Sequence, residues 1–450
     1  MIMKKMEIKK LLERVKKDRV KLVELQFSDF LGRVKSVTLN YSNLPDAFDH
    51  GVWFDGSSVE GFARIFESDM VLYPDPDSYK ILPWWSDHDN GSVARFICNV
   101  GLPSGKMFSG DPRNILTNVL KEAEDLGFIY NVGAEPEFFI FKKNQSGEIN
   151  VSSRGNGDYF VLSMDETYDI KKKIIQTLNS LGINVEMSHY EVANNQHEID
   201  FRFSDALTAA DNVMTFKYAV KKITADYGYF ASFMPKPIFG VNGSGMHCHQ
   251  SLFTKSGSNA FVDKKNKYGL SKTAYHFIAG QIKYAREISA ILAPIVNSYK
   301  RLTPGYEAPV YLCWARRNRS ALIRIPEVSP GREISTRAEI RCPDPSCNPY
   351  LAFAMMLKAG LEGIKKKEKL ADPVEEDVYK FDDAMLTKYY IEKMPGSLDE
   401  AIKLMKKGTI VRRVMGDYTF DRYIETKRQE WDSFRTAVTD WEIKRYLETT

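Results

Sequence analysis

The stretch Gly133-Ala-Glu-Pro-Glu-Phe-Phe-Ile-Phe141 places two carboxylates two residues apart, just before a run of apolar side chains. Successive side chains of a strand alternate between its two faces, so Glu135 and Glu137 would project to the same side. A solvated strand face fits poorly because four apolar residues follow directly. Two buried like charges raise each other's pKa unless a cation neutralises them. The pattern therefore favours a metal site or an acid–base site on a partly buried sheet.

A second stretch, Asn242 to Leu252, begins with a Gly-rich segment that predicts a turn and continues into His247-Cys248-His249. The chain has only seven histidines, and two of them lie in this tripeptide. On a strand both imidazoles would share a face, beside a loop of backbone N–H groups. Such a pattern suits a metal, a phosphate or both. A Gly-rich hairpin with two partly exposed histidines is the alternative.

Three further strings carry charges at similar spacing. Glu191 follows His189-Tyr190, and Glu198 and Asp200 are two residues apart; either string could also be a surface hairpin. Arg337, Glu339 and Arg341 alternate in the same way and could form a salt-bridge ladder, which contributes little at a surface. Lining a cavity, the same residues would bind anions around a metal ligand.

Arginines are concentrated in one part of the chain between residues 300 and 341. Arginine suits bidentate recognition of phosphate and carboxylate groups. An exposed basic patch is disfavoured because Leu322, Ile323 and Ile325 alternate with Arg324 and require burial. Several carboxylates with a histidine make an oxygen-rich divalent metal site, and the arginines around it imply an anionic substrate and a transferred phosphoryl group.

The composition is that of an ordinary soluble globular protein, with 450 residues, 43% hydrophobic and 27% charged. A formal charge of +4 without a Lys/Arg run disfavours a nucleic-acid partner. Five cysteines without a CxxC pair favour a reducing compartment. No window approaches the roughly 18 apolar residues of a membrane span, so no membrane partner is expected. We therefore expect a cytoplasmic protein.

The order of elements predicts two domains. Residues up to about 103 predict one helix followed by strands at 21–27, 34–39, 83–85 and 94–100, and Gly101-Leu-Pro-Ser-Gly105 is the linker candidate. Beyond it we expect helices near 113–126, 165–181, 205–227, 271–292 and 346–366. Strands are expected at 129–142, 184–203, 245–253, 319–326 and 335–341. A helical tail follows from about Leu398, and its last segment, 422–447, is expected to be one helix that needs a partner surface.

Six strings together resemble the glutamine synthetase family, type I, α-like subgroup: Phe54-Asp-Gly-Ser-Ser58, Ala134-Glu-Pro-Glu137, Asn242-Gly-Ser-Gly-Met-His-Cys-His249, Lys300-Arg-Leu-Thr-Pro-Gly-Tyr-Glu-Ala-Pro309, Arg317-Asn-Arg-Ser320 and Asn348-Pro-Tyr-Leu351. The resemblance covers essentially the whole chain. It implies an α+β fold, with a small N-terminal β-grasp domain over residues 1–104. A larger catalytic domain over 105–450 would have a curved antiparallel sheet backed by helices and carry the helical tail.

The resemblance also implies a homododecamer of two stacked hexamers, with active sites between subunits and the tail docked across the interface of the hexamers. It implies ATP-dependent ligation of ammonia to the side-chain carboxylate of L-glutamate, through γ-glutamyl phosphate, in central nitrogen assimilation. Two Mg²⁺ or Mn²⁺ ions per site would take part. Glu137, Glu191 and Glu198 match the ligands of one ion, and Glu135, His247 and Glu339 match those of the other.

The remaining site residues follow from the same resemblance. The positions that match glutamate-binding residues are Asn242, Gly243, Arg301, Glu307, Arg319 and Arg341. The positions that match ATP-binding residues are Phe203, His249, Ser251, Arg324 and Arg337. The positions that match ammonium-binding residues are Asp55, Ser58, Tyr159 and Glu191. Asp55, Glu307, Arg319 and Arg341 would be catalytic, with Asp55 as the base for ammonium and Glu307 on a mobile flap. Arg64 matches an arginine linked to feedback by glutamine. A PII-type regulator is possible, and the surroundings of Tyr379 depart from the adenylylation pattern of the other subgroup.

Two other functions remain open from the sequence. A γ-glutamyl ligase that uses an amine in place of ammonia would carry a similar site, although the acidic Asp55 and Glu191 favour ammonia. A catalytically silent relative would serve as a structural or regulatory assembly, but it would have lost metal-binding carboxylates, and all are present here.

Overall fold

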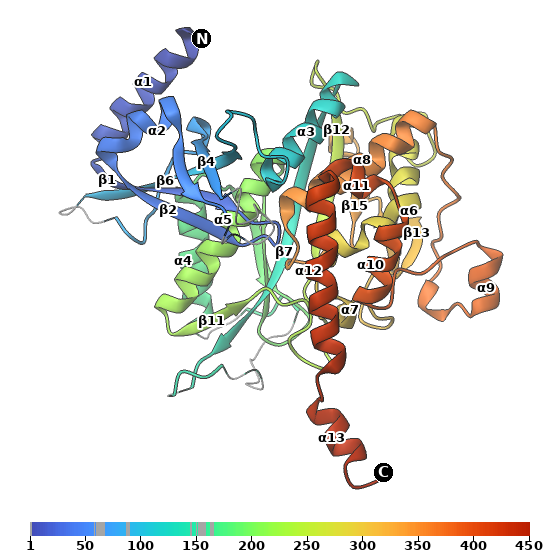
Figure 1. Cartoon of the computed structure of the whole chain (residues 1–450). Coiled ribbons are helices and arrows are strands. Elements are labelled where there is room, and N and C mark those ends of the chain that lie inside the picture. Colours follow the sequence, from blue (N-terminus) through green and yellow to red (C-terminus); the bar gives the residue numbers. More distant parts are fainter. Residues whose placement is uncertain are drawn as a thin grey trace.

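The chain folds into an N-terminal sheet domain packed against a larger domain built on a second sheet (Figure 1). This computed structural model describes residues 2–57, 59, 68–86, 91–144, 146–149, 151, 159–162 and 166–450. No helix in these ranges is long and apolar enough to cross a membrane.

The N-terminal domain is a six-stranded sheet in the order β2-β1-β6-β4-β3, with β5 on β6. The predicted hairpin is present as β1 (Val20–Ser28) and β2 (Val34–Asn40), and β6 (Ser92–Gly101) runs parallel to β1. The other strands, β3 (Val52–Asp55), β4 (Asp69–Pro74) and β5 (Lys80–Ile81), are antiparallel to their neighbours. The helices are α1 (Ile2–Lys17) and α2 (Leu44–His50). Val23, Leu25 and Phe96 form the centre of this domain's core.

One predicted strand of this domain is wrong. Residues 83–85 form a turn in which the Trp85 N–H donates to the Leu82 carbonyl at 3.2 Å. Pro83 explains the difference, because proline has no N–H for a sheet ladder and its fixed φ suits the second position of a turn.

The second sheet has nine strands among the described residues, in the order β13-β14-β15-β12-β7-β9-β8, with β10 and β11 on β7. The longest is β7 (Phe128–Lys142), between β12 (Met246–Thr254) and β9 (Gln196–Phe201). The other strands are β8 (Val185–Tyr190), β10 (Ser204–Asp205), β11 (Tyr229–Ser232), β13 (Tyr311–Ala315), β14 (Ala321–Arg324) and β15 (Ala338–Ile340). All pairs are antiparallel except β13 with β14.

Helices cover one face of this sheet and leave the other for the site. They are α3 (Pro112–Asp125), α4 (Glu166–Ser180), α5 (Ala206–Asp226), α6 (Lys272–Leu292), α7 (Ser298–Arg301) and α8 (Pro349–Lys366). Apolar residues of β7 and β12, including Phe138, Ile140 and Cys248, join the helices in the main core. In α6, a Cβ at Gly280 would lie 2.3 Å from the Ala359 carbonyl of α8, so only glycine permits this close helix packing.

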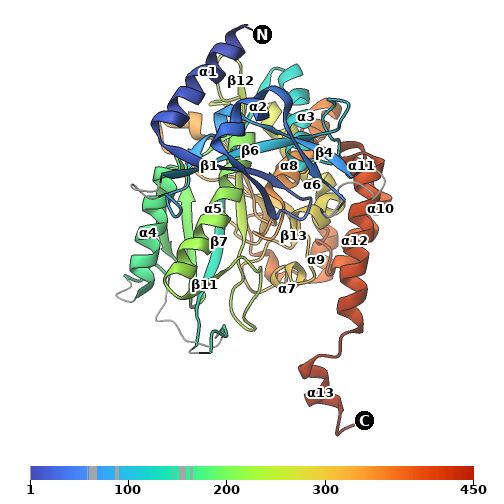
Figure 2. The same ribbon diagram turned by 60° about the vertical axis from the view of Figure 1, so that its left-hand side comes forward.

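The C-terminal part contains α9 (Asp383–Lys388), α10 (Leu398–Lys407), α11 (Ile410–Met415), α12 (Asp417–Thr436) and α13 (Asp440–Tyr446). The single helix predicted over 422–447 is wrong, because the chain breaks between α12 and α13. Thr439 starts a new helix there by a capping box with Glu442. Both views show α13 projecting away from the rest of the chain (Figures 1 and 2).

A buried arginine ties the two domains together. Arg113 at the start of α3 contacts Asp75 of the N-terminal domain at 2.6 Å and Asp211 of α5 at 3.0 Å. Its guanidinium also donates to Asn99 at 2.8 Å, and the Tyr350 hydroxyl of α8 donates to Asp211 at 2.6 Å. This network fixes the N-terminal sheet relative to the site-bearing sheet.

Candidate active site

The strand register gathers the predicted acidic residues on the uncovered face of the large sheet. Glu135 on β7 lies opposite His247 on β12, and Glu137 lies opposite Glu198 on β9. Glu339 on β15 lies opposite His249 on β12. The period-two spacing read from the sequence therefore does place these side chains on one face.

His247 lies between three carboxylates. Its Nδ1 is 3.9 Å from Glu135 and 3.8 Å from Glu339, and its Nε2 is 3.9 Å from Glu137. These separations are too long for hydrogen bonds, and carboxylates and imidazoles are both groups that bind divalent ions. The donor set of carboxylates and an imidazole therefore fits divalent metal ions.

The cavity in front of this face carries an excess of negative charge. Seven carboxyl groups line it, against four guanidinium groups. The carboxyl groups are those of Glu135, Glu137, Glu191, Glu198, Asp200, Glu307 and Glu339, and the guanidinium groups are those of Arg301, Arg319, Arg324 and Arg341. Bound cations or protons are required to balance this set at neutral pH.

Burial and mutual repulsion raise the pKa values of several of these carboxyl groups above their ordinary range. Burial, and then the charge of Glu191, raise the pKa of Glu137 to about 8. Burial, and then Glu137, also raise the pKa of Glu198. Glu135 differs: burial raises its pKa, but the His249 imidazole, at 2.7 Å, together with Arg324 and Arg337, lowers the pKa by more than burial raises it. A cation would favour the charged forms of the first two.

Two groups of side chains lie close enough to share an ion. In each group the ligand atoms lie within 4.8 Å of one another: Glu135 with His249 and Glu339, and His189 with Glu198 and Asp200. The first differs from the predicted set in that His249 takes the place of His247. The second adds two residues that the sequence analysis left without a role, His189 and Asp200.

The predicted glutamate-side residues line the same cavity. Asn242, Gly243, Arg301, Glu307, Arg319 and Arg341 all belong to its wall, together with Tyr159. Arg319 lies 3.7 Å from Glu307, and Arg341 lies 3.2 Å from Glu339. Arg301 is buried, and its guanidinium donates to the carbonyl oxygens of Arg341, Cys342 and Pro343. Arg301 therefore also holds the chain that follows β15.

A second cavity adjoins the first and contains most of the predicted ATP-side residues. Phe203, His249, Ser251 and Arg337 line it, and Arg337 donates to Nδ1 of His249 at 3.1 Å. Arg324 lies in the first cavity instead, paired with Glu339. Glu186 and Arg332 line the second cavity as well. Arg332 belongs to the arginine-rich stretch between residues 300 and 341, whereas the sequence analysis missed Glu186 because no local motif includes it.

The glycines of the Asn242–Leu252 stretch are needed for a different reason from the predicted one. Neither Gly243 nor Gly245 has a positive φ, so the expected glycine turn is wrong. A Cβ at Gly243 would lie 2.2 Å from the Pro235 carbonyl, and one at Gly245 would lie 2.5 Å from Arg301 Nη2. The close approach of neighbouring groups therefore excludes side chains here.

One predicted residue, Asp55, lies apart from the two cavities described above. Asp55 is exposed at the end of β3, and its carboxylate accepts from the Ser57 N–H at 2.8 Å. Ser58 and Arg64 fall outside the described residues.

A small N-terminal sheet joined to a larger, mostly antiparallel sheet, with an acidic and arginine-lined cavity, fits a metal-dependent enzyme that acts on anionic substrates. The family model "Glutamine synthetase, beta-Grasp domain" matches residues 19–103, and "Glutamine synthetase, catalytic domain" matches residues 109–446. The chain therefore belongs to the glutamine synthetase family. Members of this family are ligases that make glutamine and depend on ATP and divalent metal ions.

Individual relatives agree with this assignment. A glutamine synthetase of Methanosarcina mazei is 49% identical over 437 residues, which cover 97% of this chain and 96% of the relative. One of Halobacterium salinarum is 45% identical over 97% of this chain and 96% of the relative. Among solved structures, an ADP complex of GmaS superposes with a TM-score of 0.86 at 28% identity, covering 97% of this chain and 99% of that one. The predicted α+β fold is confirmed.

Proposed function

We propose that this protein joins ammonia to the side-chain carboxylate of L-glutamate at the expense of ATP, through γ-glutamyl phosphate. The observation that carries the proposal is the cavity in which seven carboxyl groups and four guanidinium groups meet beside His247. Two Mg²⁺ or Mn²⁺ ions, when bound, would supply positive charge that stabilises the reacting phosphoryl group. Glu137, Glu191 and Glu198 would hold one ion, and Glu135, His247 and Glu339 the other.

The arginines would act on the anionic groups of the substrates. Arg319 and Arg341 reach the cavity from β-strand ends and would neutralise charge that develops on the phosphoryl oxygens. Arg301, with Asn242 and Gly243, would hold the glutamate. Phe203, His249, Ser251, Arg324 and Arg337 would contact the nucleotide, most of them in the adjoining cavity.

Glu307 is built to shield the acyl phosphate. Its backbone has a φ of 55°, which is unusual for a residue other than glycine, and its side chain is paired with Arg319. The Tyr379 hydroxyl donates to the carbonyl of the next residue, Ala308, at 2.6 Å and anchors this segment. The segment would close over the site and exclude water from the intermediate. A Tyr379 held in this way is not a modification site.

Ammonium would be bound by Tyr159 and Glu191 in the cavity and by Asp55 and Ser58 of a neighbouring subunit. Asp55 is exposed in the single chain, as a residue that completes a neighbour's site would be. The assembly would be a homododecamer of two hexamers in the cytoplasm. The exposed α13, with Trp441 at 65% exposure, would cross between the hexamers. Arg64 and a PII-type protein would regulate it.

One assay tests the reaction. The full chain is given Mg-ATP and L-glutamate with either ammonium or an alkylamine, and phosphate release and the amide product are measured. We expect glutamine with ammonium. Turnover with an amine alone would assign it to the amine-using ligases, and no turnover with either would refute the enzyme function. Glu339→Gln should lose turnover, while Asp383→Asn, on a 94% exposed carboxylate of α9, should keep it.

A further inference from the structure

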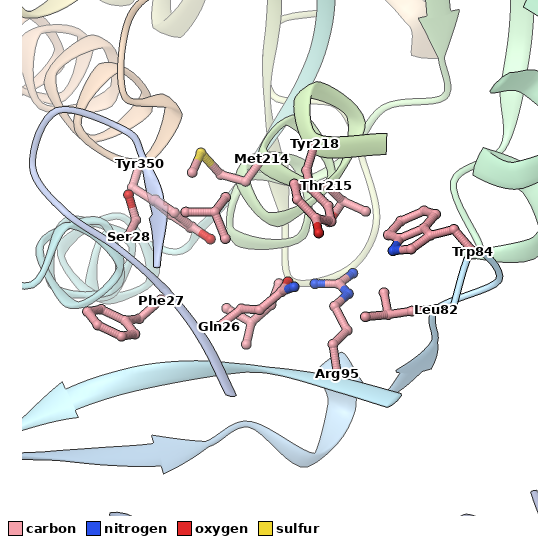
Figure 3. A pocket seen from close by; sticks show the side chains of 12 residues that line it. Gln26, Phe27, Ser28, Leu82, Trp84, Arg95, Met214, Thr215, Tyr218 and Tyr350 are labelled. Carbon is pink, nitrogen blue, oxygen red and sulfur yellow. The ribbon is translucent and has the colours of Figure 1, made fainter. Parts of the chain in front are cut away.

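A small cavity lies at the joint between the two domains, away from the acidic face (Figure 3). The N-terminal domain contributes Gln26, Val34 and Arg95 to its wall, among others, and the large domain contributes Thr215 and Tyr218 of α5 and Tyr350 of α8. The cavity wall is mostly apolar, so each polar group in it needs a hydrogen-bonding or charged partner.

Arg95 points into this cavity (Figure 3), and none of the described carboxylates forms an ion pair with it. Its side chain is only 5% exposed, and its Nε–H has no acceptor. No carboxylate within the described ranges forms an ion pair with it; the nearby Asp211 is bound by Arg113 and Tyr350. A guanidinium group stays charged at any ordinary pH. Burying a cation without an anionic partner costs desolvation free energy that no ion pair offsets.

Two more groups point to an anion at the same place. The indole N–H of Trp84 is buried without an acceptor, and Figure 3 shows it turned toward the Arg95 guanidinium, with the amide end of Gln26 on the other side. Lys80 on β5 lies opposite Arg95 in the strand register, and burial and then Arg95 lower its pKa. Donors and positive charge therefore accumulate where Asp211, the carboxylate that acts on Arg95, is already bound by Arg113 and Tyr350.

The size of the cavity decides what kind of anion can fit. The space inside amounts to about 20 Å³, which is room for about one water-sized occupant. Nucleotides, amino acids and dicarboxylates are too large. A neutral water would accept the hydrogen bonds but leave the charge of Arg95 uncompensated.

We propose that this cavity binds a single small inorganic anion of the size of chloride, held by the Arg95 guanidinium and the Trp84 indole N–H. The anion would lie between β6 of the N-terminal domain and α5 of the large domain, which lines the facing wall with Thr215 and Tyr218, beside the Arg113 network. It therefore stabilises the joint that positions the N-terminal domain. The inference is independent of the proposed reaction, because none of its residues lies in the acidic cavity.

The direct test is crystallographic. Crystals of the full chain are grown or soaked in sodium bromide and, separately, in sodium gluconate, and diffraction is measured at the bromine absorption edge. We expect an anomalous peak within hydrogen-bonding distance of Arg95 and Trp84 in bromide only. A water molecule or a carboxylate of the chain at that position in both salts would overturn the proposal.

A solution test uses the same salts at constant ionic strength. Chloride or bromide should raise the unfolding midpoint of the wild type by about 1–3 °C over gluconate. The increment should vanish in Arg95→Met and shrink in Trp84→Phe. It should persist in Trp85→Phe, which alters the adjacent exposed indole. An equal increment in Arg95→Met and the wild type would refute the site, and the bromide crystals decide the case if a variant does not fold.

Discussion

Binding of a divalent ion to the acidic cavity should release protons at neutral pH. Burial, and then repulsion by Glu191, raise the pKa of Glu137 to about 8 in the metal-free protein. Burial, and then repulsion by Glu137, also raise the pKa of Glu198. Metal ligands must be deprotonated, so an ion that uses both carboxylates has to displace the protons that they share.

The number of protons released follows from the titration of the Glu137 and Glu198 carboxyl groups. A group with a pKa of about 8 is roughly nine-tenths protonated at pH 7, and the second proton is held at least as firmly, so about one to two protons should leave per ion. The affinity for Mg²⁺ should therefore rise about 10- to 100-fold from pH 6 to pH 7. Because the pKa values of Glu137 and Glu198 are raised in the folded state, the stability of the metal-free fold should decrease as the pH rises through these pKa values. Binding of Mg²⁺ should restore that stability.

Isothermal titration of Mg²⁺ in phosphate and in Tris measures the protons directly, because the two buffers have different heats of ionisation. Glu198→Gln should release about one proton fewer than the wild type, whereas Glu327→Gln, at the exposed rim, should release the same number. Identical heats in both buffers, or an affinity independent of pH between 6 and 7, would refute the reasoning about this carboxylate pair.

Three other substitutions test separate parts of the structure. Arg113→Met should reduce the free energy of unfolding, measured by denaturant titration, by about 3–5 kcal/mol, because it leaves Asp75 and Asp211 without their cation. The control Arg435→Met, at an exposed arginine, should change this free energy by less than about 1 kcal/mol. Equal effects of the two substitutions would contradict the prediction. Gly245→Ala, which forces a Cβ against Arg301, should cost roughly 100-fold in kcat with unchanged circular dichroism, and Gly396→Ala, with open space around it, should cost little. Asp55→Ala should cost about 10²–10⁴-fold in rate at saturating ammonium, and a near wild-type rate would remove Asp55 from the proposed base role.

Local patterns in the sequence predicted the face of each strand more reliably than its ends. Period-two spacing is a property of the strand itself, so Glu135 and Glu137 could be placed on one face before any partner was known. The predicted strand over 184–203 is in fact two strands, β8 and β9, because Asn195 turns the chain with a φ of 65°. Asparagine tolerates this conformation, so a signal was present but was not used.

Contacts between distant segments could not be read from the sequence. Arg113 follows a helix-capping motif, and nothing near it in the chain announces Asp75 or Asp211 as partners. Arg301 lies in a recognisable motif, but its hydrogen bonds to three carbonyl groups after β15 appear only in the fold. The strand β13 was missed because residues 311–315 are buried on both faces and show no alternation.

Two arginines show how the surroundings of a buried cation separate structure from ligand binding. Arg113 satisfies its donors with two aspartates and an asparagine, so its charge is accounted for within the chain. Arg95, at the same joint, has comparable burial but no such partners in the described segments. A fold gains nothing from burying an unpaired guanidinium in an apolar cavity, because its desolvation costs several kcal/mol. The contrast therefore makes Arg113 a structural residue and Arg95 a binding residue.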